Sequence, residues 1–125
     1  MNIELNPWIL EKTVLPQHTD HAGVMWHGSY LNWLEEARVD SLAKLGIPYA
    51  DLALSGYEIP VIDMKIKYSR PLFHGDNVVL KSSFVYKKGP RLICETTFEK
   101  DFEKNRQTSN SCLAVLCYKK INTCF

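Results

Sequence analysis

One segment of this chain has the apolar spacing of a helix, and most of the others have the spacing of strands. Residues 29–45 read SYLNWLEEARVDSLAKL, contain neither Gly nor Pro, and repeat their apolar side chains every three or four positions. Gly46 and Pro48 then end the helical pattern. The apolar face of this segment is unusually wide, so the predicted helix needs cover on several sides.

The strand pattern is clearest where Ile62, Met64, Ile66 and Tyr68 alternate with polar residues, which predicts a half-buried strand. Similar alternation predicts four further strands, over residues 9–15, 78–86, 92–98 and 112–118. A short helix is predicted over residues 48–54. Turns are predicted over residues 71–76 and 87–90, and a loop over residues 100–106.

This order of elements predicts an α+β fold in which a five-stranded antiparallel sheet curls around one long central helix. Nothing in the sequence suggests a boundary, so residues 1–125 are expected to form a single domain. The last strand is apolar on both faces, and the sheet has an open edge. We therefore expect a homo-oligomer, a dimer or a tetramer.

The composition is that of a globular protein, with 46% apolar residues, 23% charged residues and a net charge of +1. This balance argues against a nucleic-acid partner, and no apolar run predicts a membrane span or a secretory signal. The four cysteines are Cys94, Cys112, Cys117 and Cys124, and they lack the spacing of a zinc site. We interpret them as reduced thiols in a cytoplasmic protein.

The segment most relevant to chemistry is residues 17–30, QHTDHAGVMWHGSY, which holds Asp20, two glycines and three of the four histidines. It leads into the long helix, whose start either Gly28 or Ser29 could cap. The N-terminus of a helix offers backbone N–H donors to an oxyanion, and His27 and Gly28 are predicted to lie there.

A metal site is the alternative interpretation of the same segment. His18, Asp20, His21 and His27 are possible ligands, but they lack the helical spacing of known zinc motifs. We therefore expect no metal.

The pattern T-D-x-x-G-V-x-x-H-G-x-Y-L-x-W-x-E-E-A-R, from Thr19 to Arg38, resembles the hotdog-fold thioesterases of the 4-hydroxybenzoyl-CoA type. The resemblance implies hydrolysis of an acyl-CoA without a further cofactor, since coenzyme A is part of the substrate. It also implies dimers that pair their sheets edge to edge, and often tetramers. The family commonly has an aspartate where this chain has His18.

The same resemblance assigns roles to individual residues. It makes Asp20 the carboxylate that attacks the thioester or activates water, and it lets the backbone N–H of His27 polarise the carbonyl. Gly28 allows close approach of the substrate, and Trp26 is a weaker candidate for the wall of the acyl pocket.

A basic cluster of Lys87, Lys88 and Arg91 is expected to contact the phosphates of coenzyme A, unless it is simply a solvated turn.

Three questions stay open at this level. The chain could bind acyl-CoA without turnover, or it could be a hydratase of enoyl thioesters with the same fold. The acyl group could be aromatic, such as hydroxybenzoyl or dihydroxynaphthoyl, or a short or medium aliphatic chain. The role of Asp20 as nucleophile or general base is also undecided.

Overall fold

The computed structural model describes residues 3–4, 8–46, 49–86, 91–102, 105–117 and 119–120. The predicted basic residues Lys87 and Lys88, together with Cys124, lie outside these ranges. None of the described helices is both long and apolar enough to cross a membrane.

The predicted long helix is present as α1, His27–Lys44, and it begins two residues earlier than the sequence suggested. Its N-cap residue is Trp26, which makes no side-chain capping bond, so the predicted caps at Gly28 and Ser29 were wrong. Ser29 is buried instead, and its hydroxyl donates to the backbone oxygen of His18 at 3.0 Å. The preceding loop therefore supports the helix start through the main chain.

The C-terminal end of α1 agrees with the prediction. Gly46 has a φ of 96°, and its N–H donates to the carbonyl oxygen of Ala43 at 3.0 Å. A positive φ is favourable for glycine because it has no Cβ. A second short helix, α2, follows at Tyr49–Leu54.

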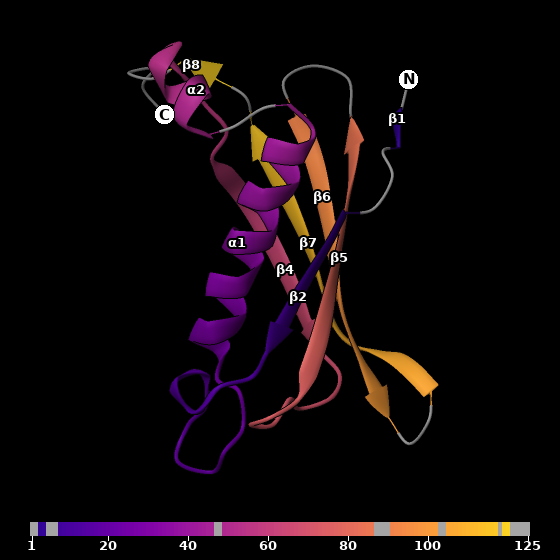
Figure 1. Cartoon of the computed structure of the whole chain (residues 1–125). Coiled ribbons are helices and arrows are strands. Elements are labelled where there is room, and N and C mark those ends of the chain that lie inside the picture. The colour runs from indigo at the N-terminus through magenta and orange to yellow at the C-terminus, as the bar shows by residue number, and fades with distance from the viewer. Residues whose placement is uncertain are drawn as a thin grey trace.

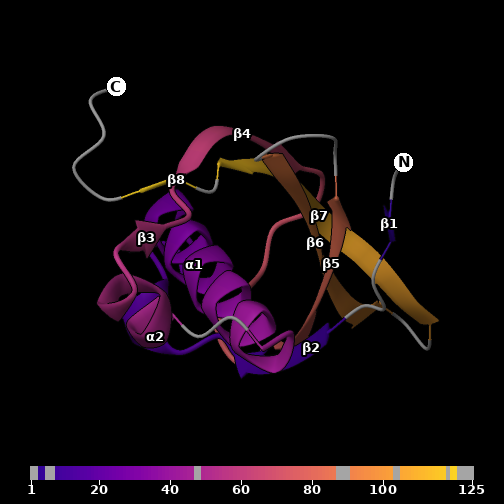
Figure 2. The same cartoon turned by 90° about the horizontal axis from the view of Figure 1, so that it is seen from above.

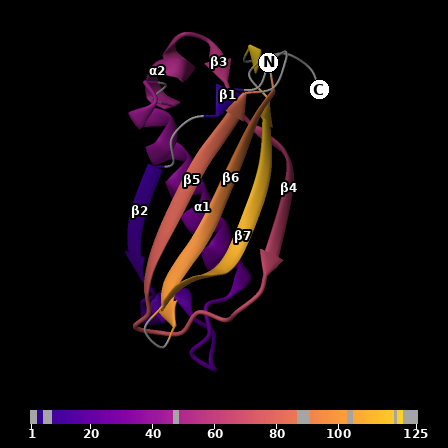
Figure 3. The same ribbon diagram turned by 90° about the vertical axis from the view of Figure 1, so that its right-hand side faces the viewer.

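The main sheet has five strand positions, all antiparallel (Figure 3). Across the sheet they are β2 (Trp8–Thr13), β5 (Asn77–Tyr86), β6 (Arg91–Phe102), β7 (Asn105–Cys117) and β4 (Val61–Tyr68). The short β1 (Ile3–Glu4) pairs with β5 beyond the end of β2. Two further short strands, β3 (Tyr57–Glu58) and β8 (Lys119–Lys120), form a separate pair.

The sheet curls around α1, as Figure 2 shows in a view along the helix. The buried face of α1 includes Tyr30, Trp33, Leu34 and Ala37, and these pack with Phe98 of β6 and other apolar residues of the sheet. A second apolar cluster surrounds the C-terminal half of α1. The predicted wrapping of the sheet around one central helix is confirmed.

The polar run over residues 100–106 was predicted as a loop, and this was wrong. Strand β6 extends to Phe102 and β7 begins at Asn105, with Lys100 opposite Gln107 and Phe102 opposite Asn105. This end of the hairpin projects away from α1 (Figure 1). Strands that no helix covers have no need of an apolar face, so hydrophobic alternation does not reveal them.

The direction of β5 fixes which features lie at which end of the molecule. Asn77, at its start, pairs with Thr13, and Val14 and Asp76 hydrogen-bond beside them. The strand has 10 residues, which at about 3.3 Å each carry the chain about 30 Å away. The end of β5 at Tyr86 and the start of β6 at Arg91 therefore lie at the end of the sheet opposite to the N-terminus of α1 (Figure 1).

Candidate active site

The site is built where two connections meet at the N-terminal end of α1. The N–H of Met25 donates to the carbonyl oxygen of Leu72 at 2.8 Å, and the N–H of Val14 donates to that of Asp76 at 2.9 Å. Residues 14–26 and 71–76 therefore form one hydrogen-bonded layer.

A charged contact fixes the second of these connections. The carboxylate of Asp76 accepts from the N–H of Phe73 at 2.7 Å and pairs with Lys100 of β6 at 2.6 Å. The ammonium of Lys100 also lies 5.6 Å from the ring centroid of Phe73. The connection after β4 is thus tied to the sheet as well as to the loop before α1.

Asp20 lies in a short loop that folds back on itself. Thr19 and Met25 form an antiparallel bridge, and the N–H of Asp20 donates to the oxygen of Val24 at 2.9 Å. The Oδ1 atom of Asp20 accepts from the N–H groups of Ala22 and Val24, at 2.9 and 3.2 Å. Among the described residues no group donates a hydrogen bond to its Oδ2 atom, so one carboxylate oxygen is oriented by the loop and the other is available.

The first N–H groups of α1 are the second part of the site. The N–H of Ser29 donates to the oxygen of Trp26, whereas the N–H groups of His27 and Gly28 have no acceptor in the described part of the chain. Unpaired donors at a helix N-terminus, aided by the helix dipole, suit an oxygen that carries developing negative charge. The predicted position of His27 and Gly28 at the helix start is confirmed.

The close packing of the Trp26 indole against the helix backbone requires a glycine at position 28. A Cβ added at Gly28 would lie 2.2 Å from Cη2 of the indole ring, which therefore covers this part of the helix backbone. The indole is 45% exposed, and its ring centroid lies 5.1 Å from that of His27. Trp26 thus shields the helix start on one side rather than filling the core.

His18 stands where an aspartate was expected, and its imidazole ring supplies a hydrogen-bond acceptor. Its Nδ1 atom accepts from the N–H of Leu15 at 3.0 Å, and its ring lies edge-on to Trp33 at 5.2 Å between centroids. Burial, and then the charge of Lys12, lower the pKa of His18, while Glu36 opposes them. The neutral imidazole is the form that can accept this bond.

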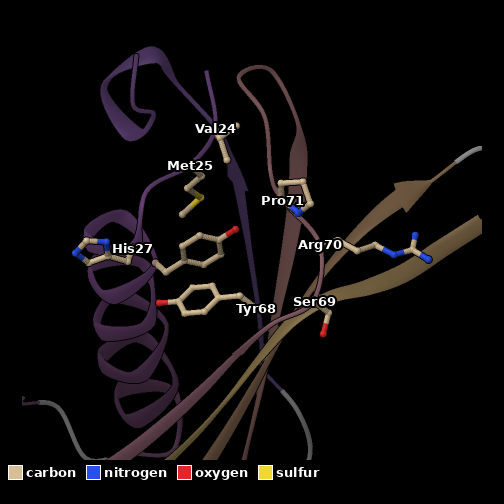
Figure 4. A pocket seen from close by; sticks show the side chains of 8 residues that line it. Val24, Met25, His27, Tyr68, Ser69, Arg70 and Pro71 are labelled. Carbon is tan, nitrogen blue, oxygen red and sulfur yellow. The ribbon is translucent and has the colours of Figure 1, made fainter. Parts of the chain in front are cut away.

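A pocket of about 350 Å³ opens beside the helix start (Figure 4). Its lining combines apolar side chains with two phenols and a few polar groups, namely Val24, Met25, His27, Tyr30, Tyr68, Ser69, Arg70 and Pro71. Figure 4 shows the imidazole of His27 directed away from Tyr68 and Met25. The backbone of His27 is therefore better placed than its ring to serve this pocket.

The sequence did not single out Tyr68, Ser69, Arg70 and Pro71 as site residues. Tyr68 ends β4 and the other three follow it, about 40 positions after the motif, and only the pairing of the two connections brings them to the helix start. The hydroxyl of Tyr30 is enclosed here, and burial raises its pKa, although hydrogen bonds from Asn110 and the backbone of Leu72 oppose this.

Arg91, the described residue of the predicted phosphate-binding cluster, is not beside this pocket within one chain. Arg91 is exposed and begins β6, at the opposite end of the sheet from His27 (Figure 1). Lys87 and Lys88 are outside the described ranges. A contribution of Arg91 to the site at His27 would have to come from another copy of the chain.

Within the described ranges no group of three or more His, Cys, Asp or Glu side chains could hold a metal ion. Cys94 and Cys112 are buried free thiols in β6 and β7, and burial raises the pKa of both, that of Cys112 to about 11. Buried, protonated thiols of this kind act as apolar filling.

A long helix wrapped by an antiparallel sheet, with a loop that carries an aspartate at the helix start, is an arrangement that can be compared with known sequences and structures. Residues 14–122 match the Thioesterase-like superfamily, and this chain belongs to that family. The fold is accordingly the hotdog fold.

Individual relatives agree with this assignment. A provisionally named esterase of Synechocystis is 46% identical over 68 residues, which are 54% of this chain and 41% of that protein. The matched segments span about half the length of the curated relatives, between 41% and 55%.

Solved structures extend the likeness to most of the chain. The DHNA-CoA thioesterase of Staphylococcus aureus superposes with a TM-score of 0.81 and 29% identity, covering 94% of this chain and 76% of that one. The 4-hydroxybenzoyl-CoA thioesterase of Pseudomonas has a TM-score of 0.81 at 13% identity, covering 91% and 85%, which supports the fold alone.

Proposed function

We propose that this protein hydrolyses an acyl-CoA thioester to a carboxylic acid and free coenzyme A. The observation that supports this most directly is the pair of unpaired N–H groups at His27 and Gly28, beside a pocket and next to the loop that orients Asp20. These are the two things that thioester hydrolysis needs: donors for the carbonyl oxygen and a carboxylate at the same end of the helix.

In the proposed reaction the thioester carbonyl oxygen accepts hydrogen bonds from the start of α1. The carboxylate of Asp20 then either attacks the carbonyl carbon or removes a proton from the attacking water. The C–S bond breaks, the thiolate of coenzyme A takes up a proton, and the acid carries the added hydroxyl. If Asp20 is the nucleophile, water hydrolyses the resulting anhydride in a second step.

The names of the relatives favour the same reaction. They include a DHNA-CoA thioesterase and 1,4-dihydroxy-2-naphthoyl-CoA hydrolases. Two tyrosine rings in the pocket wall are compatible with an aromatic acyl group, although an aliphatic group would also fit among Val24, Met25 and Pro71. The buried free thiols agree with the cytoplasmic location that we propose.

We also propose that a second copy of the chain pairs with the exposed edge of β4. Among the described strands β4 pairs only with β7, so its other edge is open. Antiparallel pairing of two copies centred on Met64 places Asp63 opposite Lys65 twice. A centre at Asp63 places Asp63 opposite itself, and a centre at Lys65 places Lys65 opposite itself although Asp63 then faces Lys67. Of these three centres, Met64 is the one that gives opposite-charge pairs without a like-charge pair.

Such pairing would bring the basic turn to the active site. Antiparallel strands place the Tyr68 end of one β4 beside the Val61 end of the other. In each chain Val61 pairs with Leu116, and Arg91 pairs with the neighbouring Cys117, so Arg91 lies at that end. Arg91 of one copy would then lie toward the pocket of the other, and we propose that it contacts the coenzyme A phosphates there together with Lys87 and Lys88, its neighbours in the sequence.

An assay of thiol release across benzoyl, hydroxybenzoyl, short and medium aliphatic acyl-CoAs tests the proposed reaction. Turnover of at least one substrate is expected. Binding without turnover, measured by calorimetry on the folded protein, would instead support an acyl-CoA-binding protein. Water addition to an enoyl-CoA without thiol release would support a hydratase.

A further inference from the structure

Asn110 of β7 is a buried polar residue that the proposed chemistry does not use. It is 1% exposed and lies opposite Tyr68 of β4 and Phe98 of β6. The register with β6 shifts directly beside it, because Phe98 pairs with Asn110 but Glu99 pairs with Thr108. The extra residue is a β-bulge, a feature that redirects side chains near functional sites.

Three hydrogen bonds of the Asn110 side chain have fixed directions. Its Oδ1 atom accepts from the N–H of Ser69 at 3.0 Å, and its Nδ2 atom donates to the carbonyl oxygen of Arg70 at 3.1 Å. An N–H can only donate and a carbonyl can only accept, so the amide orientation is not in doubt. The third bond, at 3.2 Å, therefore runs from Nδ2 to the hydroxyl oxygen of Tyr30.

These partners form half of the pocket beside His27. Asn110 does not line the pocket, but it bonds to Tyr30, Ser69 and Arg70 and pairs through the backbone with Tyr68. The rings of Tyr30 and Tyr68 also meet edge to face, with centroids 5.1 Å apart. One side chain thus joins the wall that follows β4 to the wall formed by α1.

We propose that Asn110 is a positioning residue that sets the shape of the acyl pocket and so determines which acyl groups are hydrolysed. The inference rests on the proposed thioesterase function. Loss of the amide would remove the hydrogen bonds that tie the N–H of Ser69 and the carbonyl of Arg70 to β7, so these bonds would no longer hold the segment after β4 in its position. The width of the pocket between Tyr30 and Tyr68 would change with it.

The test compares acyl selectivity, taken as the ratio of kcat/KM for benzoyl-CoA to that for hexanoyl-CoA. This ratio is independent of the fraction of enzyme that is folded, so a merely structural role would not change it. Asn110→Leu removes all three hydrogen bonds at similar size, and Tyr30→Phe removes the one to α1 together with the bond between the Tyr30 hydroxyl and the backbone of Leu72. Thr96→Val is the matched control, because its buried hydroxyl bonds to Ser82 at 3.0 Å outside the pocket.

We expect the ratio to change by at least about fivefold in Asn110→Leu and about threefold in Tyr30→Phe, since small changes of fit in a pocket alter selectivity by such factors. The Thr96→Val ratio should stay within about twofold of wild type. An unchanged ratio in both site variants would overturn the proposal, and Tyr30→Phe alone decides if Asn110→Leu does not fold. Inactivity of the wild type on every acyl-CoA would overturn the proposed function instead, and the inference with it.

Discussion

The imidazole Nδ1 of His18 accepts a hydrogen bond from the backbone N–H of Leu15 at 3.0 Å. His18 lies two residues before Asp20, the candidate catalytic carboxylate. Only the neutral ring can accept this bond, because protonation turns Nδ1 into a donor. The loop that carries Asp20 therefore depends on the protonation state of His18. Lys12 of β2 and Glu36 of α1 are the charged side chains that influence this ring.

The first prediction concerns the pH dependence of stability. The pKa of His18 is lowered in the folded protein, so the unfolded chain binds this proton more readily. The contribution of His18 to stability should be complete above its unfolded pKa of about 6.5 and should decrease as the pH falls through that value. Urea unfolding between pH 5 and 8 measures the slope. His18→Asn, which keeps an acceptor without titrating, should have a smaller slope, and equal slopes would contradict the prediction.

The second prediction concerns the carboxylate. Asp20→Asn keeps the size of the side chain and an oxygen that can accept from the N–H groups of Ala22 and Val24. We expect turnover to fall by at least about a hundredfold, as for loss of an acid–base group, with little change in melting temperature. Steady-state kinetics on the best acyl-CoA measure this. Near wild-type turnover would remove Asp20 from the mechanism.

The third prediction links Gly28 to Trp26. In Gly28→Ala the new methyl group would collide with the indole, which must leave its position over the helix start. We expect altered tryptophan fluorescence and a fall in kcat/KM of about tenfold, because small misplacements near reacting groups are costly. In a Trp26→Ala background the same change should have little further effect. Additive losses in the double variant would show that the two positions are independent.

The fourth prediction concerns the edge of β4. Asp63→Lys and Lys65→Asp, each alone, place like charges opposite one another in the proposed register and should weaken the dimer. The double variant restores opposite charges and should restore the dimer. Light scattering over a range of concentrations gives the oligomeric state. A dimer that neither single variant weakens would place the interface elsewhere, and so would a clean monomer in the wild type.

The fifth prediction separates binding from chemistry. Replacing Lys87, Lys88 and Arg91 by Ala should raise KM for acyl-CoA more than it lowers kcat, because phosphate contacts hold the ground state and the transition state alike. The cost should be about 1 kcal/mol or less per exposed contact. An acyl-pantetheine thioester, which lacks the nucleotide phosphates, should be nearly unaffected. Equal losses on both substrates would indicate that this turn supports the subunit contact.

The sequence alone was enough to predict the elements of this protein that depend on short, continuous stretches of chain. The helical period and Gly46 predicted α1 to within two residues, and the alternation around Met64 predicted β4, because burial on one face leaves a local pattern. The motif from Thr19 to Arg38 is also a continuous stretch of chain, and it identified the family and placed His27 at the helix start.

Tertiary structure alone decided which distant residues complete the pocket and which end of the molecule each feature occupies. Asn110 and Tyr30 are 80 positions apart in the sequence. No local pattern predicts that this asparagine hydrogen-bonds to both walls of a pocket. The distance of Arg91 from His27 depends on the length and direction of β5, and the long hairpin of β6 and β7 has no apolar signal where the helix does not cover it. Such contacts depend on which strands pair and in which register, and the apolar pattern of a single strand shows which face is buried but does not name the partner strand or the partner residue.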